Sequence, residues 1–326
     1  MSIPLLQIKD LSVEFNTRQG KVPALENISF NINKGETVAV VGESGSGKSV
    51  TASVILGILD KAGKIEQGEI VFNGMKLLDF TENELKNIRG REIAMIFQNP
   101  RAALNPIRSI GKQIGDILRQ HGPVPKKELR KKSIDALNSV NISSPEHRYD
   151  QYPFELSGGM CQRVMIAMAM SCKPSLLIAD EPTTGLDVTT QANIMELLKK
   201  KTSELNMSTL LITHDLSMAS QYCDRIIVMH AGHIVETAPT EDLYKNPSHP
   251  YTKKLIAATP SQQGDIEDID FIPGNLPNLL KEKSSCRFST RCDQVEDKCK
   301  AEKLSYVNVS PNHLVACWRV DTNAVA

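Results

Sequence analysis

Residues 37–59 read TVAVVGESGSGKSVTASVILGIL: a short apolar run, a glycine-rich segment and a second apolar run. The first run has the continuous apolar pattern of a strand buried on both faces, and the second is typical of a helix. Between them, residues 42–49 match G-x-x-x-x-G-K-[ST], and the position between a strand and a helix supports the motif. The sequence therefore predicts a loop that binds the phosphates of ATP or GTP.

Each residue type in this loop has a chemical reason. The glycines let backbone N–H groups approach the phosphates, Lys48 reaches the β- and γ-phosphate oxygens, and Ser49 ligates Mg²⁺. The predicted nucleotide-binding residues of the loop are Gly42, Glu43, Ser44, Gly45, Ser46, Gly47, Lys48 and Ser49.

The composition is that of an ordinary globular protein. The chain has 326 residues, of which 40% are hydrophobic, and 38 basic side chains balance 38 acidic ones. A net charge of zero gives no indication of nucleic acid as a partner. No apolar run reaches the ~18–20 residues that span a bilayer, and charges come too early for a signal peptide. We expect a soluble cytosolic protein.

The strand and helix patterns predict an α/β protein. Residues 13–25, 28–36 and 68–77 alternate as β-strands do, and the last of these holds an Asn-Gly hairpin signal. Two further buried strands are expected in SLLIAD and STLLITHD, on either side of a helix, and RIIVMHAGHIVE resembles a final hairpin. Residues 100–172 read as mostly helical, and the basic run at 126–132 as a solvated helix face.

A second acidic motif follows the strand LLIAD. Asp180 ends that strand and is expected to hold Mg²⁺ through its hydration shell. Glu181 comes next and points elsewhere, because side chains alternate along a strand, so we expect it to polarise the attacking water. Without the phosphate loop, a solvated acidic pair would be the better interpretation.

Three polar residues at strand ends complete this set. Gln98 follows the strand EIAMIF and is expected to sense the metal and the water, His214 ends TLLIT near the γ-phosphate, and Asp187 lies in TTGLD. Singly, each would be interpreted as a surface or capping residue. Their placement at the carboxyl ends of strands favours a ligand site.

A separate anion-binding pattern stands at residues 155–168, ELSGGMCQRVMIAM. Ser157, Gly158 and Gly159 open an apolar helical run, and a helix start offers unpaired N–H groups to an anion. An ordinary helix cap at Ser157 is the alternative.

In this order, GESGSGKS, Gln98, LSGGM, LLIADE, GLD and THD resemble the nucleotide-binding subunit of an ABC transporter over residues 4–258. The resemblance implies a P-loop ABC ATPase domain at 1–258, with a parallel-sheet core, an antiparallel β subdomain and a helical subdomain at about 99–172. It implies ATP hydrolysis catalysed by Glu181, His214 and Gln98, with Ser49, Gln98 and Asp180 as Mg²⁺ ligands.

The resemblance also implies that two such domains share their nucleotides. Each ATP lies between one subunit's phosphate loop and the other subunit's signature, so Ser157, Gly158 and Gly159 would reach the partner's γ-phosphate. Met160 departs from the usual glutamine of the signature. Asp187 joins the nucleotide-binding set, and Phe15 would stack on adenine, although a core role for Phe15 is equally compatible with its strand position.

The C-terminal part narrows the resemblance. NPSHPYTKKLIAATP, IPGNLPN and CRFSTRCDQVEDKC are similar to the extension of oligopeptide/dipeptide-type importer ATPases, here residues 259–326, which include a polar linker at 261–270. This implies a homologous second ATPase subunit, two permeases and an extracytoplasmic substrate-binding protein. The chain would then lie peripherally on the cytoplasmic side of the inner membrane. Di- and oligopeptides are the expected cargo, with nickel, another small chelate or cell-wall peptides as alternatives.

Four of the seven cysteines lie in this extension: Cys286, Cys292, Cys299 and Cys317. Four thiolates could hold a 4Fe–4S cluster or zinc, but the spacings of five, six and seventeen residues are looser than those of a zinc ribbon. In relatives this pattern is associated with an Fe–S cluster, which we expect here, with zinc second and four free thiols as the plain alternative.

Two other functions compete with import. A soluble ABC protein acting on ribosomes or DNA generally carries two cassettes or a long coiled-coil insertion, and this sequence has neither. A regulatory subunit that binds nucleotide without turnover would not need both Glu181 and His214.

Overall fold

The computed structural model describes residues 3–259, 271–280, 285–301 and 304–320. By their contacts, residues group into two units. The first is made of Met1–Asn33, Thr37–Leu78 and Leu211–Ala326, and the second of Lys34–Glu36 and Asp79–Leu210. The linker predicted at 261–270 lies outside the described residues.

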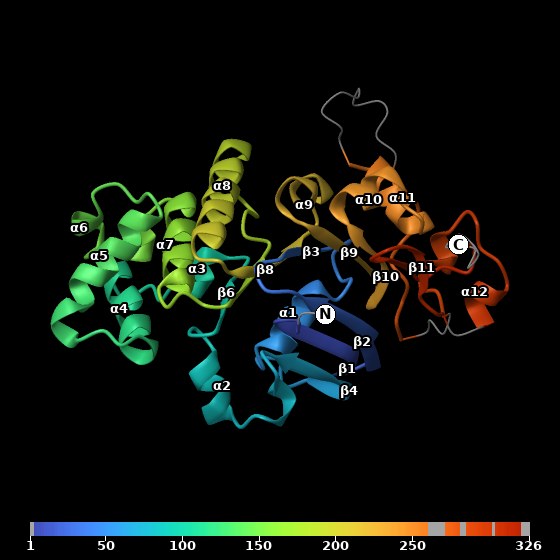
Figure 1. Cartoon of the computed structure of the whole chain (residues 1–326), viewed down its shortest axis with the longest axis horizontal. Helices are drawn as coiled ribbons and strands as arrows, with labels where there is room; N and C mark the ends of the chain where they lie inside the picture. Colours follow the sequence, from blue (N-terminus) through green and yellow to red (C-terminus); the bar gives the residue numbers. More distant parts are fainter. Residues whose placement is uncertain (1–2, 260–270, 281–284, 302–303, 321–326) are drawn as a thin grey trace. The chain divides into compact units, whose positions relative to one another are not determined.

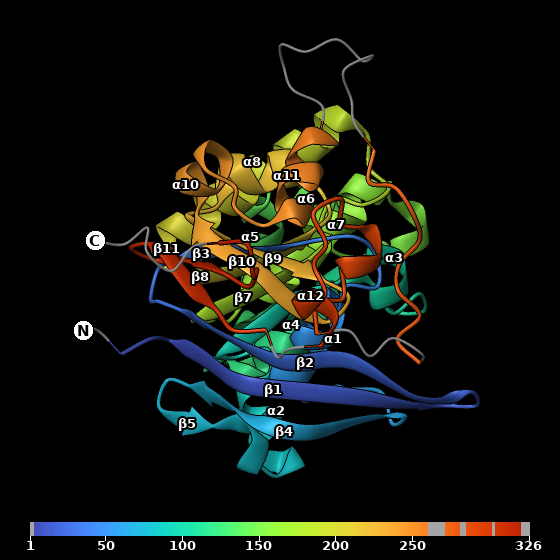
Figure 2. The ribbon, with the colours of Figure 1, turned by 90° about the vertical axis from the view of Figure 1, so that its right-hand side faces the viewer.

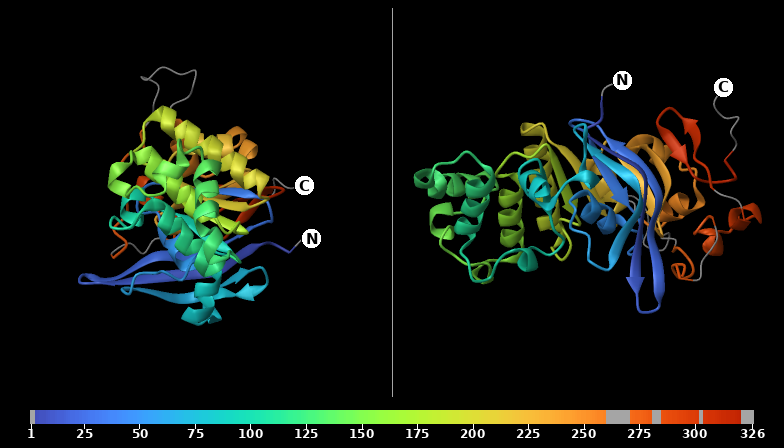
Figure 3. Two further views of the ribbon diagram at one scale, coloured as in Figure 1. Left: turned by 90° about the vertical axis from the view of Figure 1, so that its left-hand side faces the viewer. Right: turned by 90° about the horizontal axis from the view of Figure 1, so that it is seen from below.

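An antiparallel sheet in the first unit confirms the predicted β subdomain. Its strands run in the order β2-β1-β4-β5 (Figure 2) and are β1 Leu6–Thr17, β2 Gly20–Ile32, β4 Gly63–Phe72 and β5 Met75–Lys76. Asn73 and Gly74 join β4 to β5 with φ of 48° and 82°, which is the backbone that the Asn-Gly signal predicts. Figure 3 shows β1 and β2 as a long twisted ribbon.

A second sheet of this unit carries the phosphate loop. It includes, in the order β11-β12-β10-β9-β3, the strands β11 Val307–Ser310, β12 His313–Val315, β10 His233–Pro239, β9 Arg225–His230 and β3 Thr37–Val41. The buried strand β3 pairs in parallel with β9, which confirms a parallel core, and β9 and β10 form the predicted hairpin. The short strands β11 and β12, which the sequence did not predict, attach the C-terminal segment to β10.

Short helices accompany these sheets. They are α1 Lys48–Ile55, α9 Leu216–Tyr222, α10 Thr240–Lys245, α11 Pro250–Ala257, the 3-10 turn Ser289–Arg291 and α12 Lys298–Ala301. Helix α1 contacts β2, α9 contacts β3, the strand that ends at the loop, and α10 contacts β9 and β10.

In the second unit, β6 Ile93–Ile96 and the wholly buried β7 Leu176–Asp180 pair in parallel. Strand β8 Ser208–Thr213, also buried, begins in this unit and ends in the first, and the 3-10 turn Leu77–Asp79 likewise crosses the boundary. The helices are α2 Glu82–Ile88, α3 Pro100–Ala103, α4 Ile110–His121, α5 Leu129–Ser139, α6 Pro145–Arg148, α7 Gly158–Met170 and α8 Val188–Glu204, with 3-10 turns at Lys126–Glu128 and Pro153–Glu155.

The helical stretch predicted between residues 100 and 172 is confirmed. Helix α7 contacts α3, α4, α5 and β6, and Figure 1 shows α4 to α7 gathered together. Most of the buried side chains of α7 are apolar, which explains its long apolar run, and Gln162 is the buried polar one. The lysines and arginines of 126–132 are exposed, as predicted. The domain boundaries at 99, 172 and 258 stay predictions.

Candidate nucleotide site

The phosphate loop begins where β3 ends, and it is built on glycines with positive φ. Gly42, Gly45 and Gly47 have φ of 153°, 78° and 101°. An ideal Cβ on Gly42 would lie 2.1 Å from the backbone oxygen of Met229 on β9, so only glycine fits there. Gly47 is the N-cap of α1 and has no side chain to cap that helix, which leaves the helix start suited to an anion.

Lys48 lies folded over its own loop. Its Nζ donates to the carbonyl oxygens of Gly42 (2.7 Å) and Glu43 (2.9 Å), and the residue is buried. Backbone dipoles thus hold the ammonium group beside the glycines, where a phosphate would find both a positive charge and N–H donors. The loop and its lysine fit a nucleotide triphosphate, and Ser49, exposed beside Lys48, offers a hydroxyl to its metal ion.

In the second unit, the side chains of Gln98 and Glu181 are in contact. Gln98 Nε2 donates to Glu181 Oε2 (2.7 Å), and Thr184 Oγ1 donates to the same oxygen (2.9 Å). Glu181 follows the buried Asp180 at the end of β7 and has a left-handed backbone with φ of 45°. A glutamate fixed by two donors is suited to orient a water molecule.

The signature residues start helix α7. Ser157 is exposed and N-caps α7 by accepting a hydrogen bond from the backbone N–H of Met160 (3.3 Å). The cap that we considered as an alternative therefore exists. It uses one lone pair of the hydroxyl, which does not prevent an anion from approaching the helix start.

Asp187 and His214 take different local positions. Asp187 N-caps α8, accepting from Thr190 N (2.9 Å) and Thr190 Oγ1 (2.7 Å), and these bonds lower the pKa of its carboxyl. His214 is exposed at the end of β8, one residue before Asp215, which N-caps α9 through Met218 N (3.0 Å). Phe15 on β1 is half-buried and its ring lies against Gly63, so the adenine-stacking role stays a prediction.

The predicted site residues are divided between the two units. The phosphate loop, Phe15 and His214 belong to the first unit, while Gln98, Asp180, Glu181, Asp187 and the signature belong to the second. Within the second unit, the contact between Gln98 and Glu181 is the one that brings two predicted catalytic side chains together.

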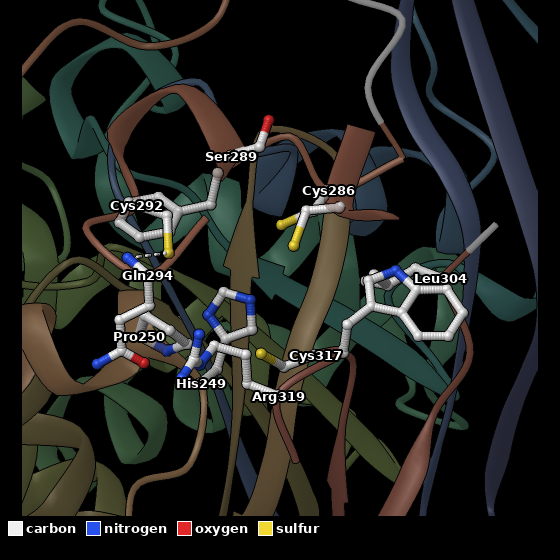
Figure 4. Close-up of a pocket in the computed structure, with 12 residues that line it drawn as sticks. His249, Pro250, Cys286, Ser289, Cys292, Gln294, Leu304, Cys317 and Arg319 are labelled. Atoms are coloured by element: carbon white, nitrogen blue, oxygen red, sulfur yellow. Dashed lines mark hydrogen bonds between the residues drawn. The ribbon is translucent and has the colours of Figure 1, made fainter. Parts of the chain in front are cut away.

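The four C-terminal cysteines line one pocket, together with His249, Phe288 and Trp318 among others; Figure 4 shows Cys286, Cys292 and Cys317 around it. Burial raises the pKa of Cys286 to about 12, and the nearby thiols add to this. In the described part of the chain, no three His, Cys, Asp or Glu side chains are placed to hold a metal ion. The predicted 4Fe–4S cluster or zinc site is therefore not supported by the arrangement, although one pocket gathers all four thiols.

Sequence reasoning missed the contacts of three residues, and two of them, Thr184 and Arg291, bond to predicted site residues. Thr184 supplies the second hydrogen bond to Glu181 from the same loop, a position that a threonine-rich stretch such as PTTGLD could have indicated. Arg287 and Arg291 stand among the cysteines, and both reach back to the N-terminal part of the first unit. Nothing in their local sequence indicated these partners.

The first unit has a strand, a glycine loop and a helix with a lysine over the loop, and the second has a glutamate held at the end of a buried strand. These features are typical of a nucleotide-hydrolysing site. The comparisons with known proteins agree. The family described as "ABC transporter" matches residues 25–184, and "Oligopeptide/dipeptide transporter, C-terminal region" matches residues 235–299.

Relatives of known name match nearly the whole chain. The oligopeptide transport ATP-binding protein AppD of Bacillus subtilis is 45% identical over 96% of each chain, and OppD of Haemophilus influenzae is 44% identical over 97% of each. The dipeptide transport ATP-binding protein DppD of Escherichia coli is 44% identical over 92% of this chain and 91% of its own. Among solved structures, the cassette MJ0796, described as dimeric and bound to ADP and phosphate, is 30% identical with a TM-score of 0.65, covering 72% of this chain and 98% of its own.

The chain therefore belongs to the ABC transporter family, among the ATP-binding proteins of the oligopeptide/dipeptide type. It is an ATPase that uses ATP with Mg²⁺. None of the helices in the described part of the chain has the length and apolar content needed to cross a membrane.

Proposed function

We propose that this chain powers the uptake of di- or oligopeptides through a membrane importer by hydrolysing ATP. The observation that carries the proposal is the match, at 42–45% identity and over almost the whole length, to peptide transport ATP-binding proteins. Nickel, another small chelate and cell-wall peptides are the alternative cargoes, because an ATPase subunit does not touch its cargo. A soluble ABC ATPase outside transport is disfavoured by the C-terminal match.

The proposed catalytic roles follow from the contacts at the site. Lys48 neutralises the β- and γ-phosphate oxygens, and Ser49, Gln98 and Asp180 provide the oxygen ligands that Mg²⁺ prefers. Glu181 holds the attacking water by accepting a hydrogen bond from it. The carboxylate stabilises the positive charge that develops on this water as the bond to phosphorus forms. His214 would donate to the γ-phosphate.

Two chains are proposed to complete each site. Ser157, Gly158 and Gly159 at the start of α7 contribute donors to the nucleotide on a partner's phosphate loop. A γ-phosphate bridging two donor-rich surfaces makes the association of the subunits depend on the state of the nucleotide. The partner is a homologous second ATPase subunit.

The remaining partners follow from the same family. Two permease subunits would couple the ATP-dependent closure of the ATPase subunits, and its release on hydrolysis, to transport, and an extracytoplasmic protein would deliver the peptide. The chain would then lie peripherally on the cytoplasmic side of the membrane, bound through its permeases.

The Glu181→Gln variant tests the hydrolytic role. We expect ATP turnover by the assembled transporter to fall at least about 100-fold, because a neutral amide cannot accept the proton of the attacking water. ATP should still bind and hold the subunits together. Steady-state phosphate release and nucleotide titration measure the two effects, and unchanged turnover would remove Glu181 from its role.

The cargo is identified by comparing the uptake of labelled peptide with the uptake of Ni²⁺ by the same vesicles.

We also propose that Cys286, Cys292, Cys299 and Cys317 together hold a metal centre. What supports this is that all four line one pocket. The 4Fe–4S cluster is the first choice because the cysteine pattern resembles that of relatives associated with such a cluster, and zinc, which needs its sulfur ligands to converge at ~2.3 Å, is the second. Its role would be to pin the C-terminal segment.

Iron, zinc and sulfide analysis of protein purified without oxygen tests this centre. We expect about four irons per chain and visible absorbance from thiolate-to-iron charge transfer. One zinc per chain would favour the second choice. If the analysis finds neither iron nor zinc, the four cysteines are free thiols.

A further inference from the structure

The C-terminal segment contacts the phosphate loop through an ion pair with Glu43, the second residue of that loop. Arg291, in the 3-10 turn between Cys286 and Cys292, donates from Nη1 to Glu43 Oε2 (2.7 Å) and from Nη2 to Glu43 Oε1 (3.0 Å). Two parallel bonds between a guanidinium and a carboxylate fix both partners in orientation. The arginine side chain is only 3% exposed, so water screens the pair weakly.

The main chain of Glu43 is held from the same part of the molecule. Its backbone N–H donates to the hydroxyl of Tyr251 (3.0 Å), a fully buried residue at the start of α11. Further along the loop, the side chain of Leu276 faces Gly45. The loop is therefore contacted by residues that follow the family's hydrolytic motifs by many positions.

Arg291 is itself fixed before it reaches Glu43. Its Nε donates to the carbonyl oxygen of Pro273 (2.9 Å) and its Nη2 to that of Ile272 (3.3 Å), and the guanidinium lies 5.8 Å from the ring centre of Phe288. These contacts restrict the rotamers of the side chain, so the arginine is held ready for the carboxylate.

A neutral histidine, His230, also lies beside Arg291. His230, at the end of β9, packs edge-on against Tyr251 and Phe288, with ring centres 4.7 and 5.3 Å away. Its Nε2 lies 3.4 Å from Arg291 Nη1. Burial, followed by the charge of Arg291, lowers the pKa of His230 to about 3, so the ring is uncharged and does not compete for Glu43.

We propose that Arg291 is a positioning residue for ATP. Through Glu43 it holds the glycine-rich loop in its binding conformation, so the C-terminal segment contributes to nucleotide affinity without touching the nucleotide. The physical reason is that glycines at 42, 45 and 47 leave the loop many conformations, and ordering it in advance lowers the cost of binding. This proposal rests on the proposed function.

The first test is Arg291→Gln in the full chain. We expect the Kd for a non-hydrolysable ATP analogue to rise about tenfold. In the assembled transporter, KM for ATP should rise by a similar factor while kcat stays within about twofold, because the loop still closes on bound ATP. A role confined to stability would lower the melting temperature and leave this split between KM and kcat absent.

Lys254→Gln is the matched control. Lys254 on α11 pairs with Asp293 (3.2 Å), next to Cys292, so it also joins α11 to the cysteine-rich segment, but it makes no contact with the loop among the described interactions. We expect its affinity for the analogue to equal that of the unchanged chain. An equal loss in both variants would overturn the proposal.

Glu43→Gln and the double variant keep the test decisive if Arg291→Gln folds poorly. Glu43→Gln retains the backbone N–H that reaches Tyr251 and removes only the charge. If the two side chains act as one unit, the double variant should bind no more weakly than the weaker single variant. Additive losses, or unchanged affinity in Glu43→Gln, would refute the positioning role. Absence of ATP binding by the unchanged chain would instead refute the proposed function.

Discussion

Gly42 shows how one residue fixes the start of the phosphate loop. Its φ of 153° and the 2.1 Å between an ideal Cβ and the backbone oxygen of Met229 leave no room for a side chain. The obstacle is main chain of a central strand, which cannot shift as the end of a flexible side chain can. Gly74, in the turn between β4 and β5, has a φ of 82° with nothing within 4 Å.

This pair of glycines gives a stability prediction. Both Gly42→Ala and Gly74→Ala impose a strained backbone, but only Gly42→Ala adds a clash, so it should destabilise the chain by about 2 kcal/mol or more beyond Gly74→Ala. Urea unfolding of the two variants without nucleotide measures the difference. Equal midpoints would mean that β3 and β9 can separate at this point.

Residue identities in the loop and at Glu181 could be predicted from the sequence because each motif is continuous along the chain. The placement of Gln98 and Glu181 at the ends of strands could be predicted from the sequence, but the hydrogen bond between them was not. The contact of Arg291 with Glu43 could not be predicted. The two residues are 248 positions apart, and their charges are two among many on the chain.

At the scale of elements, the strands β3, β7 and β8 were predictable because they are buried on both faces and read as continuous apolar runs. β12 was not, because three residues are too few to show alternation, and it becomes a strand only by pairing with β10. Nor does the sequence indicate that Arg287 of the C-terminal segment bonds to β2 and to the turn between β9 and β10.

Glu26 on β2 is the acidic partner in this contact. It accepts from His233 (3.2 Å) and pairs with Arg287, whose buried guanidinium also donates to the carbonyl oxygens of Pro23 and Ala231. The hydrogen bond from His233, followed by the charge of Arg287, lowers the pKa of Glu26 from 4.5 to about 2. Its negative charge therefore stabilises the folded state.

We expect Glu26→Gln to lower the melting temperature by roughly 1–4 °C at pH 7, since the carboxylate is about half exposed. A carboxyl whose pKa falls on folding stabilises fully above its unfolded value of 4.5 and loses this effect as pH falls towards 2. The difference between the two proteins should therefore shrink from pH 5 to pH 3. Glu66→Gln, which breaks an exposed pair with Lys64, is the control, and a constant difference across this range would contradict the assignment.

For the whole molecule, the proposed function requires that a nucleotide be completed by a second chain. The exposed Ser157 has no role at its own phosphate loop in this proposal, so its functional contact must come from outside the chain. The relative MJ0796, whose structure is described as dimeric with ADP and phosphate bound, is consistent with such an arrangement. The assembly is predicted from the sequence only through the family resemblance, and it stays a prediction.

Ser157→Arg separates the two kinds of site. A long cation at the start of α7 opposes the helix dipole and fills the space in front of the helix, so ATP turnover by the assembled transporter should fall at least about tenfold. Binding of an ATP analogue by the variant chain alone should stay within about twofold, because its own phosphate loop is unchanged. Ser139→Arg, an equally exposed serine at the end of α5, controls for the added charge. Should the variant chain alone lose its own nucleotide affinity as far as turnover falls, Ser157 would belong to its own site, and the nucleotide would not be shared between two chains.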